Sequence, residues 1–316
     1  MKTSMDVHDE PLIEILPGPT LTAEQELKYD TLLGLASQWN QSFDGSPLAE
    51  HERRWITREC LIRYLRACKW ITEHSLARLK ATILWRREQR IDDLTAEGPM
   101  LEELSTGRLI PLGYDKTGRP CLYYNLLKDT PELSHVHLSH LFFMTERAID
   151  MMHPGVESIT VIIDLRGASR SLMPSMTKLR AYIAAFQEHN PERLGLAILP
   201  TAIPWWFNSL WKIMRLFIDP AVKKKIKLNR EASHYITKDQ LWTDHGGSLD
   251  FELDDDYWDE FLGEAGKRRG EYVKRWEAAG KRLGESEEYL RGGGRFDDGF
   301  GINLTMVACV IENESC

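Results

Sequence analysis

The chain has 316 residues, 42% of them hydrophobic and 28% charged, which is ordinary for a soluble globular protein with a sizeable core. The formal net charge of −8 argues against a general nucleic-acid-binding protein, so we expect no nucleic-acid partner. The five cysteines are odd in number and form no CxxC motif, which indicates neither a disulfide framework nor a cysteine zinc site and fits a reducing cytosol.

No targeting or membrane-spanning segment is expected. Residues 1–19 lack the apolar core of a secretory signal, and no run reaches the about 18 apolar residues that a spanning helix needs. Residues 1–20 are rich in proline and acidic residues, so we predict that they form a flexible arm.

Residues 21–105 are predicted to form an N-terminal helical domain. A helix is expected from Thr22 to Gln41, with Leu27, Leu35 and Trp39 among its inward side chains. Thr57 can cap a second helix, and apolar residues at helical spacing recur from there to about residue 90.

A helix capped by Thr72 is predicted to follow and to end near Arg90. Two segments of the chain are basic. Residues 53–90 hold 11 Lys or Arg against 3 Asp or Glu, and residues 205–230 hold 7 Lys or Arg against 1 Asp or Glu. Two basic segments in an acidic protein can meet an anionic surface locally, each cation contributing about 1 kcal/mol near anionic lipid. The alternative is that they are ordinary solvated helix faces.

From residue 106 to residue 263 the pattern is that of alternating strands and helices. Strands are predicted over 121–125, 159–164 and 194–199, and helices over 139–153, capped by Ser139, and over 175–189. This order predicts a mostly parallel sheet with helices packed on it. A polar helix is expected from Tyr257 to about Tyr289, its part beyond the sheet domain being residues 264–290, and residues 291–316 are predicted to be a flexible tail.

The stretch from Trp205 to Ile218 is apolar on almost every side. Asn208, Lys212 and Arg215 make one narrow polar stripe, whereas a surface helix shows an apolar stripe on a polar background. Two interpretations stay open: a fully buried core helix, or a helix that covers its own protein with one face and offers the other to something else apolar.

The sequence carries none of the common catalytic motifs. The sequence contains no G-x-S-x-G elbow, no P-loop and no dinucleotide-binding fingerprint after a strand. His135, His137 and His140 have no acidic or cysteine partner at helical spacing, so we predict no metal site. Asp164 follows a buried strand without a paired base, which favours a structural role. We therefore expect no enzyme activity.

Six segments agree in order and spacing with a known family. They are LIRYLRACKWITEHSLARLKATILWRR (61–87), GYDKTGRPCLYY (113–124), VIIDLRGAS (161–169), PERLG (191–195), WWFNSLWKIMRLFIDP (205–220) and GGSLDFE (246–252). Together they resemble the CRAL-TRIO lipid-transfer family, in particular the fungal phosphatidylinositol transfer proteins.

The resemblance implies an α/β fold in which an N-terminal helical domain precedes a mixed, mostly parallel sheet flanked by helices. The sheet would enclose a hydrophobic lipid pocket under a mobile lid helix. The residues implied for the lid are Trp205, Trp206, Phe207, Leu210, Trp211, Met214, Phe217 and Ile218. The residues expected to line the pocket are Tyr123, Ile159, Val161, Ile163 and Phe186.

The resemblance also implies a site for the lipid head group. Glu192 matches the acidic residue of the PER motif, Lys225 the lysine after the lid, and Lys69 the lysine of a basic motif after the first helices. Chemically, the lysines can meet a phosphate, and Glu192 can accept hydrogen bonds from inositol hydroxyls.

Two positions depart from the family pattern, because Cys68 stands where an arginine is usual and Val222 where a threonine is usual. We expect Arg66, one turn back, to compensate for the first. Ile159 and Phe186 match positions of phosphatidylcholine-coordinating serines, so the sequence predicts weak or no phosphatidylcholine exchange.

The predicted function is therefore that of a soluble phosphatidylinositol carrier or presenter. A sterol or another hydrophobe is the alternative cargo, and a lipid-sensing scaffold is a third interpretation. We expect a monomer with no cofactor besides a bound phospholipid and transient contact with an anionic membrane surface. The expected location is cytoplasmic, peripherally associated with the endoplasmic reticulum, lipid droplets or the cell periphery.

Overall fold

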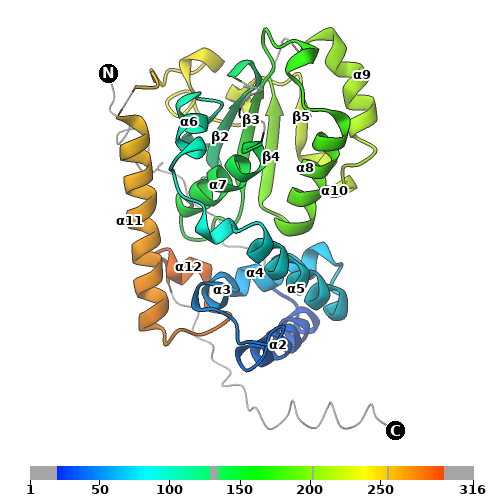
Figure 1. The fold of residues 1–316 in the computed structure, drawn as a ribbon, viewed down its shortest axis with the longest axis vertical. Helices are drawn as coiled ribbons and strands as arrows, with labels where there is room; N and C mark the ends of the chain where they lie inside the picture. Colours follow the sequence, from blue (N-terminus) through cyan, green and yellow to red (C-terminus); the bar gives the residue numbers. More distant parts are fainter. Residues whose placement is uncertain (1–19, 129–132, 134, 201–202, 255, 295–316) are drawn as a thin grey trace.

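The computed structural model describes residues 20–128, 133, 135–200, 203–254 and 256–294. Residues 1–19 of the expected arm and most of the predicted tail lie outside these ranges. The chain begins with helices α2 (Ala23–Ser37), η1 (Gln38–Asn40), α3 (Glu50–Trp55), α4 (Arg58–Ala67), α5 (Thr72–Glu88), η2 (Ile91–Asp93) and α6 (Pro99–Ser105). Helices α2 to α5 lie together at the lower end of the molecule in Figure 1.

One of the two predicted N-terminal helix caps is present in the structure. Thr57 caps α4 by accepting a hydrogen bond from the Cys60 amide, as predicted. Thr72 is instead the first residue of α5, whose N-cap is Ile71 without a side-chain bond, so the predicted cap was wrong. Leu27, expected to point inward from α2, is 67% exposed, because Tyr29, Leu32 and Ala36 form the buried face of that helix.

A five-stranded sheet follows, in the order β1-β2-β3-β4-β5. Its strands are β1 (Leu109–Tyr114), β2 (Pro120–Asn125), β3 (Ile159–Asp164), β4 (Leu194–Leu199) and β5 (Ile226–Leu228). β1 pairs antiparallel with β2, and the other neighbours are parallel. The predicted α/β class with a mixed, mostly parallel sheet is confirmed.

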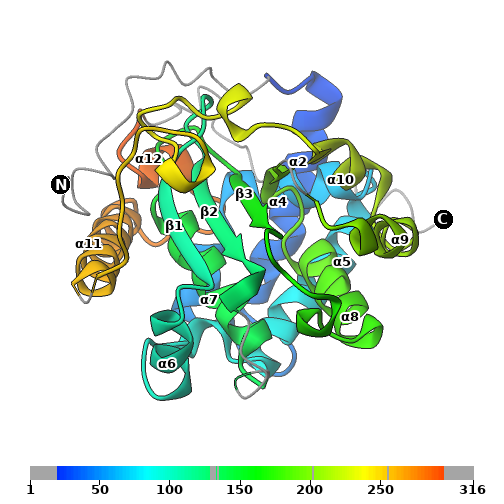
Figure 2. The same ribbon diagram turned by 90° about the horizontal axis from the view of Figure 1, so that it is seen from above.

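Helices cover one face of the sheet and an irregular segment covers the other. The helices α7 (His137–Asp150) and α8 (Met176–His189) lie on the first face, and the segment of residues 229–254 crosses the second (Figures 1 and 2). α7 begins at His137 after Val136 without a side-chain cap, so Ser139 is not its N-cap.

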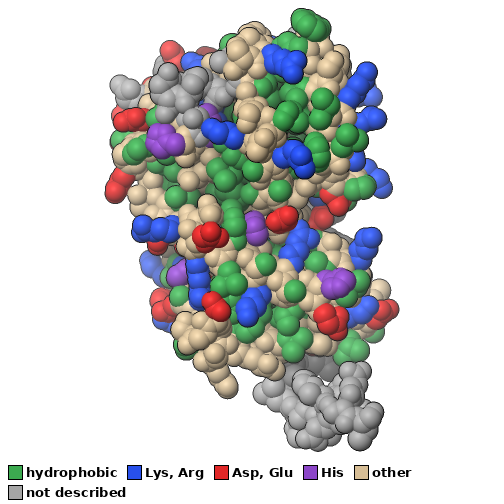
Figure 3. Space-filling model, turned by 45° about the vertical axis from the view of Figure 1, so that its right-hand side comes forward, with side chains coloured by type: hydrophobic (Ala, Val, Ile, Leu, Met, Phe, Trp, Pro, Cys, Tyr) green, Lys and Arg blue, Asp and Glu red, His purple; other side chains and the backbone are tan. Residues whose placement is uncertain are grey.

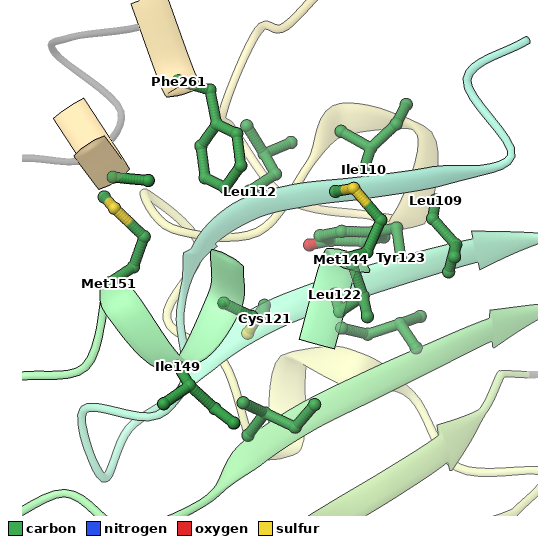
Figure 4. Packing of buried hydrophobic residues seen from close by; sticks show 14 of the residues in the cluster. Leu109, Ile110, Leu112, Cys121, Leu122, Tyr123, Met144, Ile149, Met151 and Phe261 are labelled. Carbon is green, nitrogen blue, oxygen red and sulfur yellow. The ribbon is translucent and has the colours of Figure 1, made fainter. Parts of the chain in front are cut away.

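The main core fills the space around β1 and β2, where side chains of these strands meet α7 and a later helix, α11 (Tyr257–Ala278). Figure 4 shows Leu112 of β1 beside Phe261 of α11, with Leu122 and Met144 farther along the sheet. A second cluster lies among the N-terminal helices, and a third lies beneath helix α9 (Trp205–Met214). The chain thus has separate cores for its helical part and for its sheet.

The C-terminal region differs from its predicted form. The single helix expected from Tyr257 to about Tyr289 is two helices, α11 and α12 (Glu287–Leu290), because the chain turns at Ala279 and Gly280, which has φ +83°. The remaining short elements are η3 (Leu126–Lys128), η5 (Arg170–Leu172), α10 (Pro220–Lys225), η6 (Ala232–His234) and η7 (Thr243–His245). α12 lies beside the N-terminal helices in Figure 1.

The tail predicted from residue 291 begins later. The Arg291 side chain is 8% exposed and donates a hydrogen bond to the Ile149 carbonyl over 2.7 Å. Residues 295–316 lie outside the described residues.

A buried ion network ties α12 to both halves of the chain. The Glu287 carboxylate lies 2.7 Å from Arg63 of α4 and 3.1 Å from Arg193, which precedes β4. Thr57 donates a further hydrogen bond to Glu287, so the carboxylate also holds the start of α4. Burial alone would raise the pKa of Glu287, but Arg193, Arg63 and Arg291 hold it well below its ordinary value.

Replacing this carboxylate should destabilise the whole chain. In Glu287→Gln, the side chain keeps its shape, but Arg193 loses its charged partner and Arg63 keeps Glu157, 3.3 Å away, as its remaining described partner. We expect a loss of about 3–5 kcal/mol in the free energy of unfolding, the usual cost of breaking a buried pair on one side. Chemical denaturation followed by circular dichroism measures it.

The matched control is Glu288→Gln, which alters the next residue of the same short helix, outside the network. Its free energy of unfolding should change by less than about 0.5 kcal/mol. Equal losses in the two variants would contradict a special role for Glu287.

Candidate functional site

Two helices leave apolar faces half-exposed over the sheet. α8 has no buried residue, although Leu179, Ile183 and Phe186 follow helical spacing as predicted. Beneath them, Val161 and Ile163 of β3 are also only half-buried. Groups of partly exposed apolar side chains are typical of ligand-binding grooves and interaction surfaces.

α9 is buried on one side and exposed on the other. Trp205 is 85% exposed, while Phe207 is buried against the sheet in the third core cluster. Phe207 and Ile218 are buried, and Trp206, Leu210, Trp211, Met214 and Phe217 are half-buried. The helix ends at Met214 rather than at Ile218. It is therefore not a fully buried core helix.

Charged side chains border this apolar region. Figure 3 turns α8, α9 and α10 toward the viewer and shows hydrophobic side chains with lysine and arginine side chains at their margins. Lys212, Arg215 and Lys224 are exposed, and Leu216 is 72% exposed among them. The outer surface of α9 and α10 is thus both apolar and basic.

The strand register shows which of the residues expected to line a pocket lie on the same face of the sheet. Leu122 is paired with Val161 and Tyr124 with Ile163, so these residues share the face that α9 covers. Tyr123 is paired with Ile162 and therefore lies on the opposite face, where its ring packs edge-on against Trp242. Tyr123 was wrongly predicted to line the same pocket as Val161 and Ile163.

Two further residues of that set are engaged elsewhere. Ile159 is 5% exposed and belongs to the main core. The Phe186 ring stacks on Phe142 of α7, with centroids 4.4 Å apart, so it closes the gap between α7 and α8. Val161 and Ile163 remain as half-buried candidates on the sheet itself.

The structure brings Glu192 and Lys225 together. The Lys225 ammonium at the end of α10 lies 2.8 Å from the Glu192 carboxylate, which stands in the turn between α8 and β4. Their side chains are 24% and 33% exposed, so solvent reaches both. An ion pair at this exposure contributes little to stability and can exchange for another partner.

The turn that carries Glu192 has an unusual backbone. Glu192 has φ +62°, a left-handed conformation that costs a non-glycine residue about 1 kcal/mol or more. Three residues later, a Cβ on Gly195 would lie 2.6 Å from both the Arg119 and Ser158 side chains, so a larger residue would require these side chains to move. These two positions account physically for the PERLG segment.

The other predicted head-group residues do not join this pair. Arg66 forms an ion pair with Glu157 over 3.3 Å. Lys69 is exposed in the turn after α4, with φ +55°. In the described contacts, Glu192 therefore pairs with Lys225, whereas Arg66 pairs with the Glu157 carboxylate.

The far end of the α9 segment is held by one amide side chain. Gln187 of α8 donates to the Phe217 carbonyl over 3.1 Å and accepts from the Asp219 amide over 2.6 Å. Arg180 of α8 stacks its guanidinium 4.1 Å from the centre of the Phe217 ring. The near end is held by Trp206, whose indole donates to the Ala168 carbonyl.

Sequence reasoning missed Gln187, because a single glutamine on the polar side of a helix carries no signal of its own. Arg78 of α5 donates to the Gln187 and Glu188 carbonyls, which connects the N-terminal helices to the same point. Because the family resemblance predicts that α9 is a lid, we call Gln187, Phe217 and Asp219 the lid latch.

The histidines considered for zinc have other partners. His137 and His140 lie 3.8 Å and 3.5 Å from the Glu103 carboxylate, and Arg108 contacts the same group. In the described part of the chain, no group of three or more potential metal ligands comes together. Asp164 bonds to Arg166 and lies 3.8 Å from His245, which agrees with the structural role favoured for it.

Comparison with known proteins finds two matching family models in this chain. The CRAL/TRIO domain model matches residues 104–247, and the CRAL/TRIO N-terminal domain model matches residues 28–81. Within the described residues, no helix is long and apolar enough to cross a membrane.

Two curated relatives are fungal proteins. A CRAL-TRIO domain-containing protein of Schizosaccharomyces pombe is 36% identical over 86% of this chain, which spans 28% of that protein. The phosphatidylinositol transfer protein PDR17 of Saccharomyces cerevisiae is 32% identical over 78% of this chain and 73% of its own length. Among solved structures, Sfh5 matches with a TM-score of 0.56 and 16% identity, over 74% of this chain and 91% of that one. The last likeness concerns the fold.

The lid latch makes a prediction about local opening. Gln187→Ala removes two hydrogen bonds, each worth about 1 kcal/mol, from the end of the α9 segment. Hydrogen exchange in the peptide that carries Asp219 should become about tenfold faster, with the free energy of global unfolding little changed. Mass spectrometry of deuterium uptake measures the rate.

Glu188→Ala is the control, since the Glu188 side chain is 69% exposed on the same turn of α8. Its uptake near Asp219 should match that of the unaltered chain. Unchanged uptake in Gln187→Ala would show that the latch does not restrain this segment.

Proposed function

Because this chain belongs to the CRAL-TRIO family, we propose that it binds phosphatidylinositol, draws it from a membrane into a lidded pocket and exchanges or presents it. The observation that carries this proposal is the Glu192–Lys225 pair at the edge of the half-buried apolar faces of α8 and α9. Such a carrier makes and breaks no covalent bond, so it needs no catalytic residues, metal or cofactor.

The head group would replace the existing ion pair. Lys225 would meet the phosphodiester, and Glu192 would accept hydrogen bonds from the inositol hydroxyls. Lys69, exposed in the turn after α4, would supply a second cation. Arg66 would have to leave Glu157 before it could take part.

The acyl chains set the strictest requirement. Two chains hold a lipid in its membrane by roughly 20 kcal/mol or more, at about 0.8 kcal/mol for each buried CH₂ group. A carrier competes when it buries nearly the whole of that surface. Val161, Ile163 and the half-buried faces of α8 and α9 would provide the walls.

α9 would act as the lid of this pocket. Its described polar attachments are concentrated at Trp206 near one end and at the lid latch beyond the other, so few hydrogen bonds oppose its movement. When open, Trp205 and Leu216 would enter the membrane interface, where indole and aliphatic side chains are favoured. Lys212 and Arg215 would face anionic head groups.

A sterol is the second candidate cargo. The apolar walls would accept it equally well, and the mutual neutralisation of Glu192 and Lys225 leaves the site workable without a charged head group. Both cargoes fit a monomer that meets membranes of the endoplasmic reticulum, lipid droplets or cell periphery transiently from the cytoplasm. Phosphatidylcholine exchange is proposed to be weak.

Substitution of Glu192 and Lys225 tests whether the cargo is phosphatidylinositol or a sterol. Glu192→Ala combined with Lys225→Ala should lower phosphatidylinositol transfer between vesicles at least tenfold, because the charged contacts to the head group are lost. Sterol binding should survive. Transfer of fluorescent phosphatidylinositol and phosphatidylcholine and binding of a labelled sterol provide the three readouts.

The control removes an ion pair of equal type from α2, in Glu24→Ala with Lys28→Ala, whose atoms lie 2.6 Å apart. This control should transfer phosphatidylinositol normally. Undiminished transfer by the Glu192 and Lys225 double variant would refute the proposed head-group site, and brisk phosphatidylcholine transfer would refute the lipid preference.

Membrane docking is tested by charge reversal beside the lid. Lys223→Glu with Lys224→Glu should weaken binding to anionic vesicles at low salt, because each lysine contributes about 1 kcal/mol near anionic lipid. Co-purified lipid, measured by native mass spectrometry, should be retained. Vesicle co-sedimentation measures the docking.

Lys80→Glu with Lys274→Glu applies the same reversal to exposed lysines of α5 and α11, away from the lid. If this control loses as much vesicle binding as the lid variant, net charge and not the surface beside α9 determines docking.

A further inference from the structure

The C-terminal end of α8 is capped by side chains of the N-terminal helices. α8 ends at His189, and the last carbonyls of a helix have no partner within the helix itself. The Gln187 and Glu188 carbonyls accept hydrogen bonds from Arg78 of α5, the second over 3.0 Å. The His189 carbonyl accepts one from Tyr64 of α4 over 3.4 Å. α5 lies beside α8 in Figures 1 and 2, so one part of the chain completes a helix of another.

The His189 side chain adds to this contact. Its Nδ1 atom lies 3.1 Å from the Thr82 hydroxyl, and its ring stacks on Trp85 of α5 with centroids 4.2 Å apart. Burial, followed by the charges of Arg78 and Arg86, lowers the pKa of His189 to about 4, so the ring is neutral near pH 7. Arg78 supplies a positive charge at this helix end, where the helix dipole favours one.

The capped end of α8 is also the end that carries the lid latch. The Gln187 carbonyl accepts from Arg78, and the Gln187 side chain binds the Phe217 carbonyl and the Asp219 amide. α8 has no fully buried side chain, so its position depends on these end contacts more than that of a core helix would. The backbone and the side chain of one residue therefore connect α5 to the segment that follows α9.

The turn after α8 is linked to the N-terminal helices a second time. Glu192, the proposed head-group acid, lies five residues after Gln187. The next residue, Arg193, shares the Glu287 carboxylate with Arg63 of α4. The stretch that bears both the latch and the head-group acid is thus held at each end by contacts that lead to α4 or α5.

From these contacts we propose that the N-terminal helices regulate opening of the lid, and that Arg78 is the residue that positions the lid latch. The inference rests on the proposed function, because it takes α9 to be the lid of a lipid pocket. While Arg78 holds its two carbonyls, the Gln187 amide stays within reach of its partners and α9 stays closed. A small shift of α5 away from α8 breaks these bonds and releases the end of the α9 segment.

The alternative is an ordinary helix cap that stabilises α8 alone. Removal of such a cap would destabilise α8 independently of the latch, so its effect would add to that of Gln187→Ala. A positioning residue that acts through Gln187 has no further effect once the Gln187 side chain is gone. Non-additivity of the two substitutions therefore distinguishes a positioning role from a purely structural one.

The test compares Arg78→Gln, Gln187→Ala and the double variant in the full chain. Arg78→Gln removes two hydrogen bonds and a charge from the end of α8, so hydrogen exchange in the peptide that carries Asp219 should become about tenfold faster. In the double variant, the rate should equal that of Gln187→Ala alone. Mass spectrometry of deuterium uptake measures the three rates.

Two further variants control for charge and for folding. Arg78→Lys keeps the positive charge but not the forked donor group, so its exchange rate near Asp219 should lie between those of the unaltered chain and Arg78→Gln. Lys80 lies on the same helix, with its ammonium over the Phe43 ring, and Lys80→Gln should leave the rate unchanged. The unfolding temperature of each variant shows that it is folded.

Lipid release provides the functional readout. The full chain is loaded with fluorescent phosphatidylinositol and mixed with acceptor vesicles of phosphatidylcholine. Arg78→Gln should release the lipid about tenfold faster than the unaltered chain, since the same two hydrogen bonds restrain the lid. Lys80→Gln should release it at the unaltered rate.

Three results would overturn the proposal. They are unchanged exchange near Asp219 in Arg78→Gln, additive effects in the double variant, and faster exchange without faster lipid release. If the unaltered chain takes up no phosphatidylinositol, the proposed cargo is refuted instead. The exchange rates, which are measured without lipid, then still decide whether Arg78 restrains the α9 segment.

Discussion

The structure depends most on the buried carboxylate of Glu287. It pairs with Arg63 from the N-terminal helices and with Arg193 just before β4, and the charges of these arginines keep it ionised although it is buried. Arg193 directly follows Glu192, so the network fixes the turn in which the proposed head-group acid adopts its left-handed backbone. A residue near the end of the described chain thus sets the geometry of a site about a hundred positions earlier.

The region around α9, unlike the Glu287 network, is incompletely buried and held by few polar contacts. There the apolar faces of α8 and β3 remain half-buried, and a few polar contacts hold the covering segment. Rigid parts of a protein combine dense packing with satisfied polar groups, whereas parts that move have few of either. This contrast between a rigid junction and a weakly held α9 would suit the proposed carrier, whose pocket must open without unfolding of the chain.

Sequence patterns predicted the elements well where one physical signal dominated. The Thr57 cap and the buried strand 159–164 were found in this way. Pairing of Glu192 with Lys225 came from the family resemblance, because nothing in the local pattern brings two surface charges 33 positions apart together. Tyr123 was misplaced because strand alternation gives two faces without saying which one a pocket occupies. Gln187 and Glu287 could not be foreseen, since their roles arise from tertiary contacts alone.

The two edges of the sheet differ in how they avoid pairing with another molecule. The outer groups of β1 are occupied, with Tyr257 donating to the Pro111 carbonyl and Gln240 accepting from the Tyr114 amide. β5 has three residues and follows a run of lysines. Short, lysine-bearing edge strands resist the addition of a further strand. A carrier that uncovers apolar surface, as proposed for this chain, would be exposed to aggregation, and this sheet gives a neighbouring chain little backbone with which to pair.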